Sequence, residues 1–246
     1  MNNKFYETLC LIYKNLFSII EKFFFRDKKN NKSYELFNYK FFDDVKFRII
    51  TYDNFEKIKI NKYLNKIIFP RDDIKNLIID IFHKEKIAEK ITEITGFNYK
   101  IDFFTAYETF QIQQNDLDKG WYANHYHQDK PYSSNMMKLI FSFKDITKDD
   151  GPMEIKFFDK VDNKEKKLQV ILNKNEIFLF NPVSLFHRAS SPNHKTRFQI
   201  MMQLNPSNSW KVNENIYYKQ KYREPKFPFF YYFFDKNCEL DKIELK

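Results

Sequence analysis

The segment Tyr122–Tyr132 reads YANHYHQDKPY and holds two of the five histidines in a chain of 246 residues. A strand is expected over Tyr122–His127, and alternate side chains of a β-strand point to the same face. If the extended backbone continues to Asp129, His127 and Asp129 lie on one side. An imidazole and a carboxylate in that arrangement make up part of a metal site. The segment therefore predicts the first two metal ligands of a site that a distant residue completes.

His187 is the expected third ligand. It follows the turn Asn181-Pro182 and precedes a strand-like run at Thr196–Leu204. Two histidines and one carboxylate bind non-haem Fe(II) on one face and leave the other positions open. Arg197, ten residues beyond His187, is expected to hold a carboxylate, because its planar guanidinium donates two parallel hydrogen bonds.

This order of motifs resembles the iron- and 2-oxoglutarate-dependent dioxygenases, and most closely their phytanoyl-CoA dioxygenase-like branch. The resemblance rests on Tyr126–Asp129, the distal His187, Arg197, and the turn Asp150-Gly151-Pro152 with the short strand after it. It spans roughly Tyr34 to Pro206, by pattern and spacing. After Ile155 the relatives usually continue Pro-Gly-Ser-His, whereas this chain reads KFFDK, so the neighbouring loop differs.

The resemblance implies an enzyme that uses Fe(II), O2 and 2-oxoglutarate as cosubstrate. His127, Asp129 and His187 would bind the iron, and Arg197 would bind the far carboxylate of 2-oxoglutarate. Asp129 stands where halogenating relatives carry a small residue, so its presence favours hydroxylation or another oxidation. The expected activity is hydroxylation of a small or carrier-linked molecule. Gln111 is a further expected cosubstrate contact.

Lys138 is a second candidate for binding an acid group, together with Ser142. In the predicted strand starting at Met137, Leu139, Phe141 and Phe143 form a uniformly apolar face that would pack in the core. Lys138 and Ser142 would then face a cavity, because side chains alternate along a strand.

The fold class predicted for the chain is mainly β with flanking helices, a double-stranded β-helix of the jelly-roll, cupin-like type. Short strand signals separated by polar turns are typical of that architecture, and a helix is expected from Asp72 to a stop at Gly96. The strands are expected at Phe47–Thr51, Lys57–Ile60, Tyr99–Phe104, Tyr107–Gln113, Tyr122–His127, Met137–Lys144, Met153–Phe158, Lys167–Leu172, Glu176–Asn181 and Thr196–Leu204.

Three regions are predicted along the chain. Residues 1–33 form an amphipathic helix and a polar linker, residues 34–210 form the dioxygenase domain, and residues 211–246 form an aromatic extension that packs on the domain or on a partner subunit. A homodimer is one way to cover the extension. The N-terminal helix carries too many charges for a membrane span, while peripheral contact with a membrane stays open.

The composition indicates which binding partners and which cellular compartment to expect. The net charge is +9, but the lysines are spread along the whole chain, so the balance does not indicate nucleic-acid binding. Cys10 and Cys238 lie near opposite ends and are expected to be free thiols. The start of the chain shows no secretory signal, and a cytoplasmic location is predicted.

Three alternatives remain at this point. His125, His127 and Asp129 match part of the HxHxD pattern of zinc hydrolases, but Lys130 stands where that pattern has a further histidine. The chain could also be a catalytically inactive binding module on the same fold, or a metal-dependent enzyme that does not use 2-oxoglutarate.

Overall fold

A computed structural model describes most of the chain from residue 55 onward. The described residues are 16, 19, 34–38, 55–120, 123–129, 133–159, 163–174, 176–193, 196–219 and 237–243. The strand predicted at Phe47–Thr51, nearly all of the predicted N-terminal helix, and the aromatic run at 226–236 lie outside these residues.

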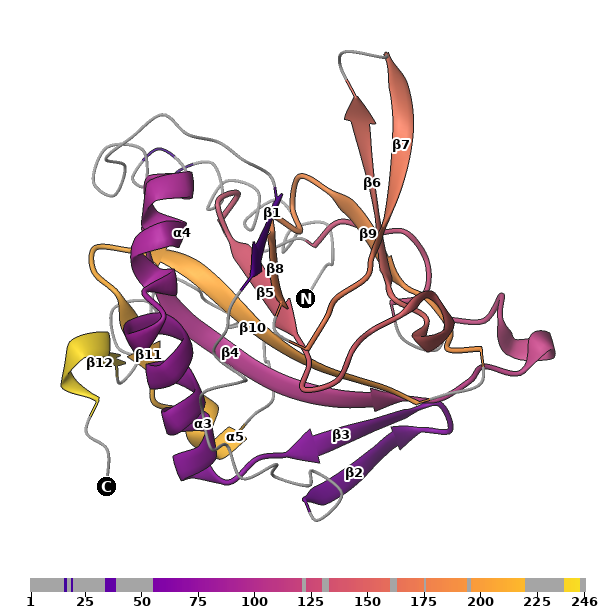
Figure 1. The fold of residues 1–246 in the computed structure, drawn as a ribbon, viewed down its shortest axis with the longest axis horizontal. Helices are drawn as coiled ribbons and strands as arrows, with labels where there is room; N and C mark the ends of the chain where they lie inside the picture. The colour runs from indigo at the N-terminus through magenta and orange to yellow at the C-terminus, as the bar shows by residue number, and fades with distance from the viewer. Residues whose placement is uncertain are drawn as a thin grey trace, which may run out of the picture.

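Most described strands belong to one large sheet (Figure 1). Neighbouring strands run antiparallel, except that β11 pairs with β4 in parallel. β3 pairs with the opposite end of β4, and β2 pairs with β3. The order across the sheet is β1 (Tyr34–Asn38), β8 (Glu176–Phe180), β5 (Met137–Phe141), β10 (Arg197–Ser207), β4 (Asn98–Thr109), β11 (Lys211–Asn213) and β12 (Asn237–Glu239), with β2 at Glu56–Asn61 and β3 at Leu64–Ile68.

A smaller antiparallel sheet places β6 (Met153–Asp159) between β7 (Lys164–Val170) and β9 (Phe186–Ala189). The β6–β7 hairpin extends well beyond the rest of the fold in Figure 1. Apolar residues of both sheets meet in one buried cluster, which includes Ile140 and Phe178 from the large sheet and Ile155 and Val170 from the small one. The two sheets therefore pack face to face.

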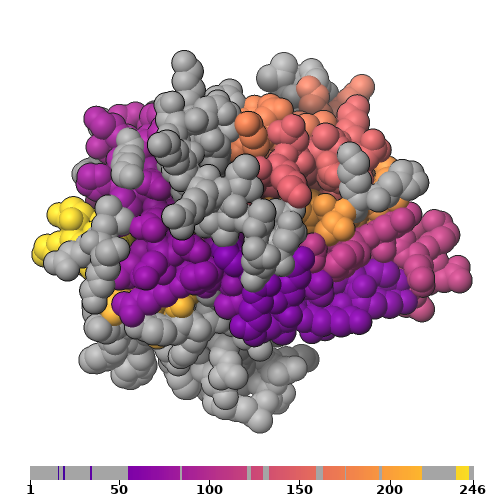
Figure 2. Space-filling model, turned by 60° about the horizontal axis from the view of Figure 1, so that its bottom comes forward, coloured from indigo at the N-terminus to yellow at the C-terminus, as the bar shows by residue number. Residues whose placement is uncertain are grey.

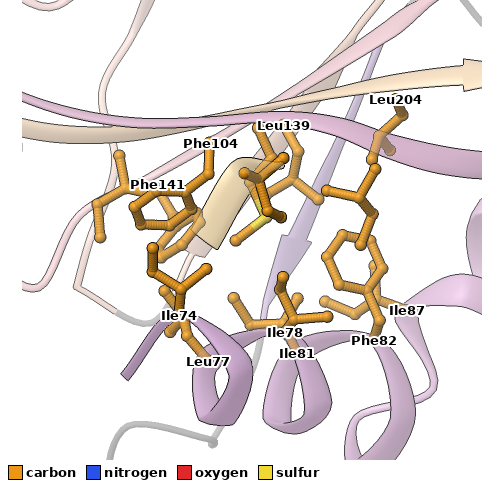
Figure 3. Close-up of a cluster of buried hydrophobic side chains, with 14 of the residues drawn as sticks. Ile74, Leu77, Ile78, Ile81, Phe82, Ile87, Phe104, Leu139, Phe141 and Leu204 are labelled. Carbon is orange, nitrogen blue, oxygen red and sulfur yellow. The ribbon is translucent and has the colours of Figure 1, made fainter. Parts of the chain in front are cut away.

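Helices cover the other face of the large sheet. α3 (Arg71–Ile78) continues through a π-helical turn (Ile79–Lys84), and α4 (Ile87–Thr95) follows it. Figure 3 shows how the apolar side chains of these helices meet those of the central strands. The residues in this contact are Ile74, Leu77, Ile78, Ile81, Phe82 and Ile87 from the helical layer and Phe104, Leu139, Phe141 and Leu204 from the sheet.

The helix predicted from Asp72 to Gly96 is wrong as one continuous helix. Lys86 has a φ of 55°, and this left-handed conformation separates the π-helical turn from α4. The predicted stop is confirmed, since Gly96 has a φ of 77° and donates its N–H to the carbonyl of Thr92 at 2.7 Å. A left-handed glycine is a common helix end.

Strand alternation in β10 decides what faces the space between the sheets. Phe198, Ile200, Met202 and Leu204 all lie in the helix-facing core. Arg197 and the other odd-numbered residues therefore point to the opposite face. β10 thus carries Arg197 into the interior of the sandwich.

Two further strand predictions need correction. A single strand, β4, replaces those predicted at Tyr99–Phe104 and Tyr107–Gln113, because it pairs continuously with β10 through a register shift at Gln203/Leu204. Residues 110–113 lie beyond its end. The strands predicted near β2, β5, β6, β8 and β10 are present, and β7 begins earlier than predicted.

The described part of the predicted C-terminal extension joins the large sheet. β11 and β12, from the predicted C-terminal extension, both belong to the large sheet, and a short helix α5 (Ile216–Lys219) follows β11. In Figure 2 the indigo and purple segments, which include β2 and β3, form a continuous band across one face below the salmon and orange segments. No helix among the described residues is long and apolar enough to cross a membrane.

Candidate metal centre

His127 and His187 form a directly hydrogen-bonded backbone pair. The His127 N–H donates to the His187 carbonyl at 3.0 Å, and the His187 N–H donates to the His127 carbonyl at 2.9 Å. Residues paired in this way across antiparallel backbone project their side chains to the same face. The two imidazole centroids lie 4.4 Å apart.

The strand predicted at Tyr122–His127 is wrong for its described part. Residues 123–127 form no strand, and Ala123 has a φ of 44°, which interrupts extended backbone. The segment is held beside β9 by the His127–His187 pair and by the Ala189 N–H, which donates to the Ala123 carbonyl at 2.9 Å. Pairing with β9, and not regular alternation, therefore orients His127.

Asp129 approaches both imidazoles. Its N–H donates to the Pro182 carbonyl at 2.9 Å, and its Oδ1 lies 3.6 Å from His127 Nε2 and 3.7 Å from His187 Nε2. Neighbouring ligands on an octahedral metal, each about 2.1 Å from the ion, lie about 3 Å apart. A short inward movement of these side chains is enough to bring all three onto one ion, so the residues fit an Fe(II) site with one open face.

Hydrogen bonds select the ring nitrogen that each histidine offers. The Nδ1 of His127 lies 2.8 Å from the His125 carbonyl, and the Nδ1 of His187 lies 3.1 Å from the Leu185 carbonyl. A carbonyl only accepts, so Nδ1 carries the proton in both rings. The Nε2 lone pairs are then left facing Asp129 and available to a metal.

Burial keeps His187 neutral. The residue is 6% exposed, and its ring packs edge-on to Phe180 with centroids 5.2 Å apart. This burial, followed by the charge of Lys138, lowers the pKa of His187 to about 4 even though Asp129 acts in the opposite direction. A neutral imidazole is the form that binds metal.

Lys138 on β5 forms an ion pair with Oδ2 of Asp129. The other carboxylate oxygen, Oδ1, is the one turned toward the histidines. Lys138 therefore neutralises Asp129 while leaving one oxygen directed at the metal position.

Arg197 lies on the wall of the cavity that contains the histidines. The open cavity has a volume of about 70 Å³. Arg197 is 4% exposed and donates from Nη1 to the Ser190 carbonyl at 3.2 Å. The remaining described lining residues are Tyr107, Thr109, Ala123, Lys138, Ile140, Met153, Phe180, Arg188, Ala189, Gln199 and Met201.

The structure brings together five of the six predicted site residues: His127, Asp129, His187, Arg197 and Lys138. The sixth, Gln111, is exposed beyond the end of β4 and is not among the described residues that line the cavity. Its expected strand ends at Thr109, so the alternation used to orient it does not apply.

His125, part of the zinc-hydrolase pattern, and Ser142, expected to face a cavity, are also not among the described residues that line this cavity. His125 is exposed, and its carbonyl, not its ring, contacts His127. Ser142 is buried, and its Oγ accepts the Lys144 N–H at 3.1 Å.

Sequence reasoning missed a polar cluster behind the histidine pair. Glu154 on β6 accepts hydrogen bonds from the hydroxyl of Tyr126 at 2.7 Å and from Nε of Arg188 at 2.8 Å. Burial and the bond to Glu154 raise the pKa of Tyr126 to about 12, so the phenol stays protonated. Burial opposes ionisation of Glu154, but the bond from Tyr126 and the charge of Arg188 hold its pKa below the ordinary value. Only the pairing of β6 with β9 reveals this cluster.

Gly151 fixes the approach of the loop between β9 and β10. It has a φ of 65°, and a Cβ at this position would lie 2.3 Å from the backbone carbon of Ser191 and 2.5 Å from the nitrogen of Pro192. The absence of a side chain in the Asp-Gly-Pro turn is therefore needed for close backbone packing.

Comparison with known proteins identifies the fold. No family model matches the chain, and no curated protein matches its sequence. Among solved structures, the chain is similar to the non-heme alpha ketoglutarate dependent epimerase SnoN from nogalamycin biosynthesis, with 12% identity, a TM-score of 0.51 and coverage of 83% of this chain and 84% of SnoN. HygX from Streptomyces hygroscopicus, solved with nickel, 2-oxoglutarate and hygromycin B, also matches, with 9% identity, a TM-score of 0.45 and coverage of 72% and 84%.

The predicted fold class is confirmed. The chain is mainly β with helices on one face, and it shares the double-stranded β-helix fold of iron- and 2-oxoglutarate-dependent oxygenases. Its His-Asp-His group resembles the facial triad of non-haem iron sites.

Proposed function

We propose that this protein is an Fe(II)- and 2-oxoglutarate-dependent dioxygenase of the phytanoyl-CoA dioxygenase-like branch, which hydroxylates a small or carrier-linked molecule. The observation that carries the proposal is the placement of Asp129 Oδ1 at nearly equal distances from the Nε2 atoms of His127 and His187. The shared fold and the cavity that contains Arg197 support it.

His127, Asp129 and His187 would hold the iron, which activates O2 when bound. Their arrangement on one side would leave the other side of the site open to the cosubstrate and O2. The hydrogen bonds at Nδ1 leave Nε2 of each histidine facing the metal position. The low pKa of His187 means that this ligand needs no deprotonation near neutral pH.

Arg197 would bind the far carboxylate of 2-oxoglutarate. Its guanidinium carries a permanent positive charge in a buried wall, where a charge-assisted hydrogen bond is stronger than in water. Lys138 would maintain the orientation of Asp129 through its contact with Oδ2. Gln111, exposed beyond β4, has no role in this proposal.

Apart from Arg188, apolar and neutral side chains would form the remainder of the substrate pocket. Ala123, Met153, Ala189 and Met201 contribute small or flexible apolar surface, while Tyr107 and Gln199 offer polar groups. This lining suits a largely apolar molecule with a few hydrogen-bonding groups.

Succinate formation from 2-oxoglutarate tests the proposal without knowledge of the primary substrate. Purified protein with Fe(II), ascorbate and 2-oxoglutarate should release succinate in air, and Asp129→Ala should lose that release. Asp118→Ala is the matched control, because Asp118 is an exposed carboxylate away from the cavity lining. Equal succinate release by Asp129→Ala and wild type would contradict the proposal. Iron binding without any release would favour an inactive module or a metalloenzyme that does not use 2-oxoglutarate.

A further inference from the structure

The two proposed histidine ligands have neighbours that meet on the opposite side of the backbone pair. Tyr126 precedes His127, and Arg188 follows His187. Alternate strand residues face opposite sides, so in β9 the side chain of Arg188 extends from the face opposite that of His187, although Arg188 also borders the cavity. Both Tyr126 and Arg188 reach the carboxylate of Glu154.

Glu154 makes three short contacts through one oxygen. Its Oε2 lies 2.7 Å from the Tyr126 hydroxyl, 2.8 Å from Arg188 Nε and 2.8 Å from Arg188 Nη2. The Glu154 side chain is 13% exposed and that of Arg188 is 38% exposed. The contacts therefore join a mostly buried carboxylate to one group from each histidine-bearing segment.

The ring of Tyr126 contacts two cations. The Arg188 guanidinium lies 4.7 Å from the ring centroid and the Lys156 ammonium lies 4.3 Å from it. Cations within about 6 Å of an aromatic face are attracted to it. Lys156 is in turn held by Glu165 at 3.1 Å.

The two histidine-bearing segments differ in how the backbone secures them. β9 pairs with β6 along its length, with Ile155 opposite His187 and Glu154 opposite Arg188. Residues 123–127 form no strand and are joined to β9 by the His127–His187 pair and the Ala189–Ala123 hydrogen bond. Side-chain contacts therefore have greater weight in fixing the position of Tyr126 and, through it, of His127.

We propose that Glu154 is a positioning residue of the metal centre, which holds Tyr126 and Arg188 so that His127 and His187 keep the separation that one ion needs. The proposal rests on the proposed metal site. Glu154 touches no ligand atom itself and acts through the backbone of its two partners. Residues that orient metal ligands typically change metal affinity by roughly 10- to 100-fold when replaced.

Titration of the protein with Co(II) under nitrogen, without 2-oxoglutarate, tests this role by affinity and by the visible Co(II) spectrum. Glu154→Ala should weaken Co(II) binding by roughly 10- to 100-fold and change the spectrum, while the thermal midpoint of the metal-free protein changes little. Tyr126→Phe keeps the ring that contacts both cations but removes one hydrogen bond, so it should weaken binding less. Glu154→Gln serves if the alanine variant does not fold, and it should also weaken binding because it loses the charge.

Lys167→Ala is the matched control. Lys167 lies on the same outer face of the small sheet, opposite Lys156 in the β6–β7 register, and is exposed. Its substitution should leave Co(II) affinity unchanged.

The outcomes separate this proposal from the proposed function. If wild type binds Co(II) through His187 but Glu154→Ala and Glu154→Gln bind it within about twofold of wild type, the positioning role is overturned and the metal site stands. If affinity falls only in proportion to a lower thermal midpoint, Glu154 is a stability residue and the proposal is also overturned. If His187→Ala binds Co(II) as wild type does, both the metal site and the positioning role are wrong.

Discussion

Replacement of Gly151 by alanine tests the packing of the turn against the loop that joins β9 to β10. The new Cβ would lie 2.3 Å from the backbone carbon of Ser191 and 2.5 Å from both the Ser191 oxygen and the Pro192 nitrogen. These neighbours are backbone atoms, so no side-chain rotation relieves the contact. The loop or the turn must move.

Two effects set the loss in the free energy of unfolding. The left-handed conformation at a φ of 65° costs alanine about 1 to 2 kcal/mol. Overpacking adds about 1 to 3 kcal/mol, so the free energy of unfolding should fall by roughly 2 to 5 kcal/mol.

Urea unfolding followed by far-UV circular dichroism measures the change, and Gly120→Ala is the matched control. A Cβ on Gly120 has no neighbour within 4 Å, so that variant should stay within about 0.5 kcal/mol of wild type or gain slightly from a stiffer unfolded chain. Gly151→Ala with wild-type stability, or an equal loss in both variants, would refute the packing argument.

Three further predictions concern charges. Arg197→Met should raise the 2-oxoglutarate concentration for half-maximal succinate release by roughly 10- to 100-fold, because charged hydrogen bonds are lost, and an unchanged value would remove Arg197 from cosubstrate binding. His187 has a pKa of about 4 in the folded protein against an ordinary 6.5. As the pH falls, the unfolded chain therefore binds a proton at His187 at a higher pH than the folded protein does. Metal-free protein should therefore lose about 2 to 4 kcal/mol of its free energy of unfolding as the pH falls from 6.5 to 4. In urea titrations His187→Gln should lose less over that range. An equal loss in both proteins would contradict the lowered pKa of His187. Hydrogen bonds from Lys119, Lys62 and Tyr63 hold the pKa of Asp116 far below its usual range. The ionised Asp116 therefore stabilises the fold at pH values above the ordinary carboxyl pKa. This stabilisation disappears as the pH falls through the lowered pKa of the folded protein. Asp116→Asn should consequently lower the thermal midpoint at pH 7 and have a smaller effect near pH 2, and the same loss at both pH values would contradict this.

The sequence was sufficient to predict which residues meet at the candidate metal centre, because the side-chain types that form such a site are few. His127, Asp129 and His187 meet in space as expected, and Arg197 and Lys138 line the same cavity. Alternation worked where the strands are regular, as in β5 and β10, whose apolar faces pack against the helices.

Local patterns failed where tertiary contacts override them. The segment before His127 looks like a strand in sequence, but the left-handed Ala123 interrupts it and pairing with β9 orients the histidine. Gln111 was assigned to a face of a strand that ends at Thr109. In the same way, the break at Lys86 divides a helix whose apolar periodicity continues on both sides.

The cluster around Glu154 illustrates information that one sequence does not contain. Tyr126, Glu154 and Arg188 are far apart in the chain, and only the register of β6 with β9 places Glu154 opposite Arg188. Strand register depends on the whole sandwich, whereas sequence periodicity describes one element at a time.

Anaerobic titration with Fe(II) and 2-oxoglutarate tests the metal centre most directly. Bidentate binding of 2-oxoglutarate to iron gives a weak visible charge-transfer band. The wild-type protein should develop this band with one equivalent of iron, His187→Ala should lack it, and Arg197→Met should require more 2-oxoglutarate to reach it. A folded wild-type protein that shows no band, or a His187→Ala variant that shows the full band, would contradict the assignment of His127, Asp129 and His187 as the iron ligands.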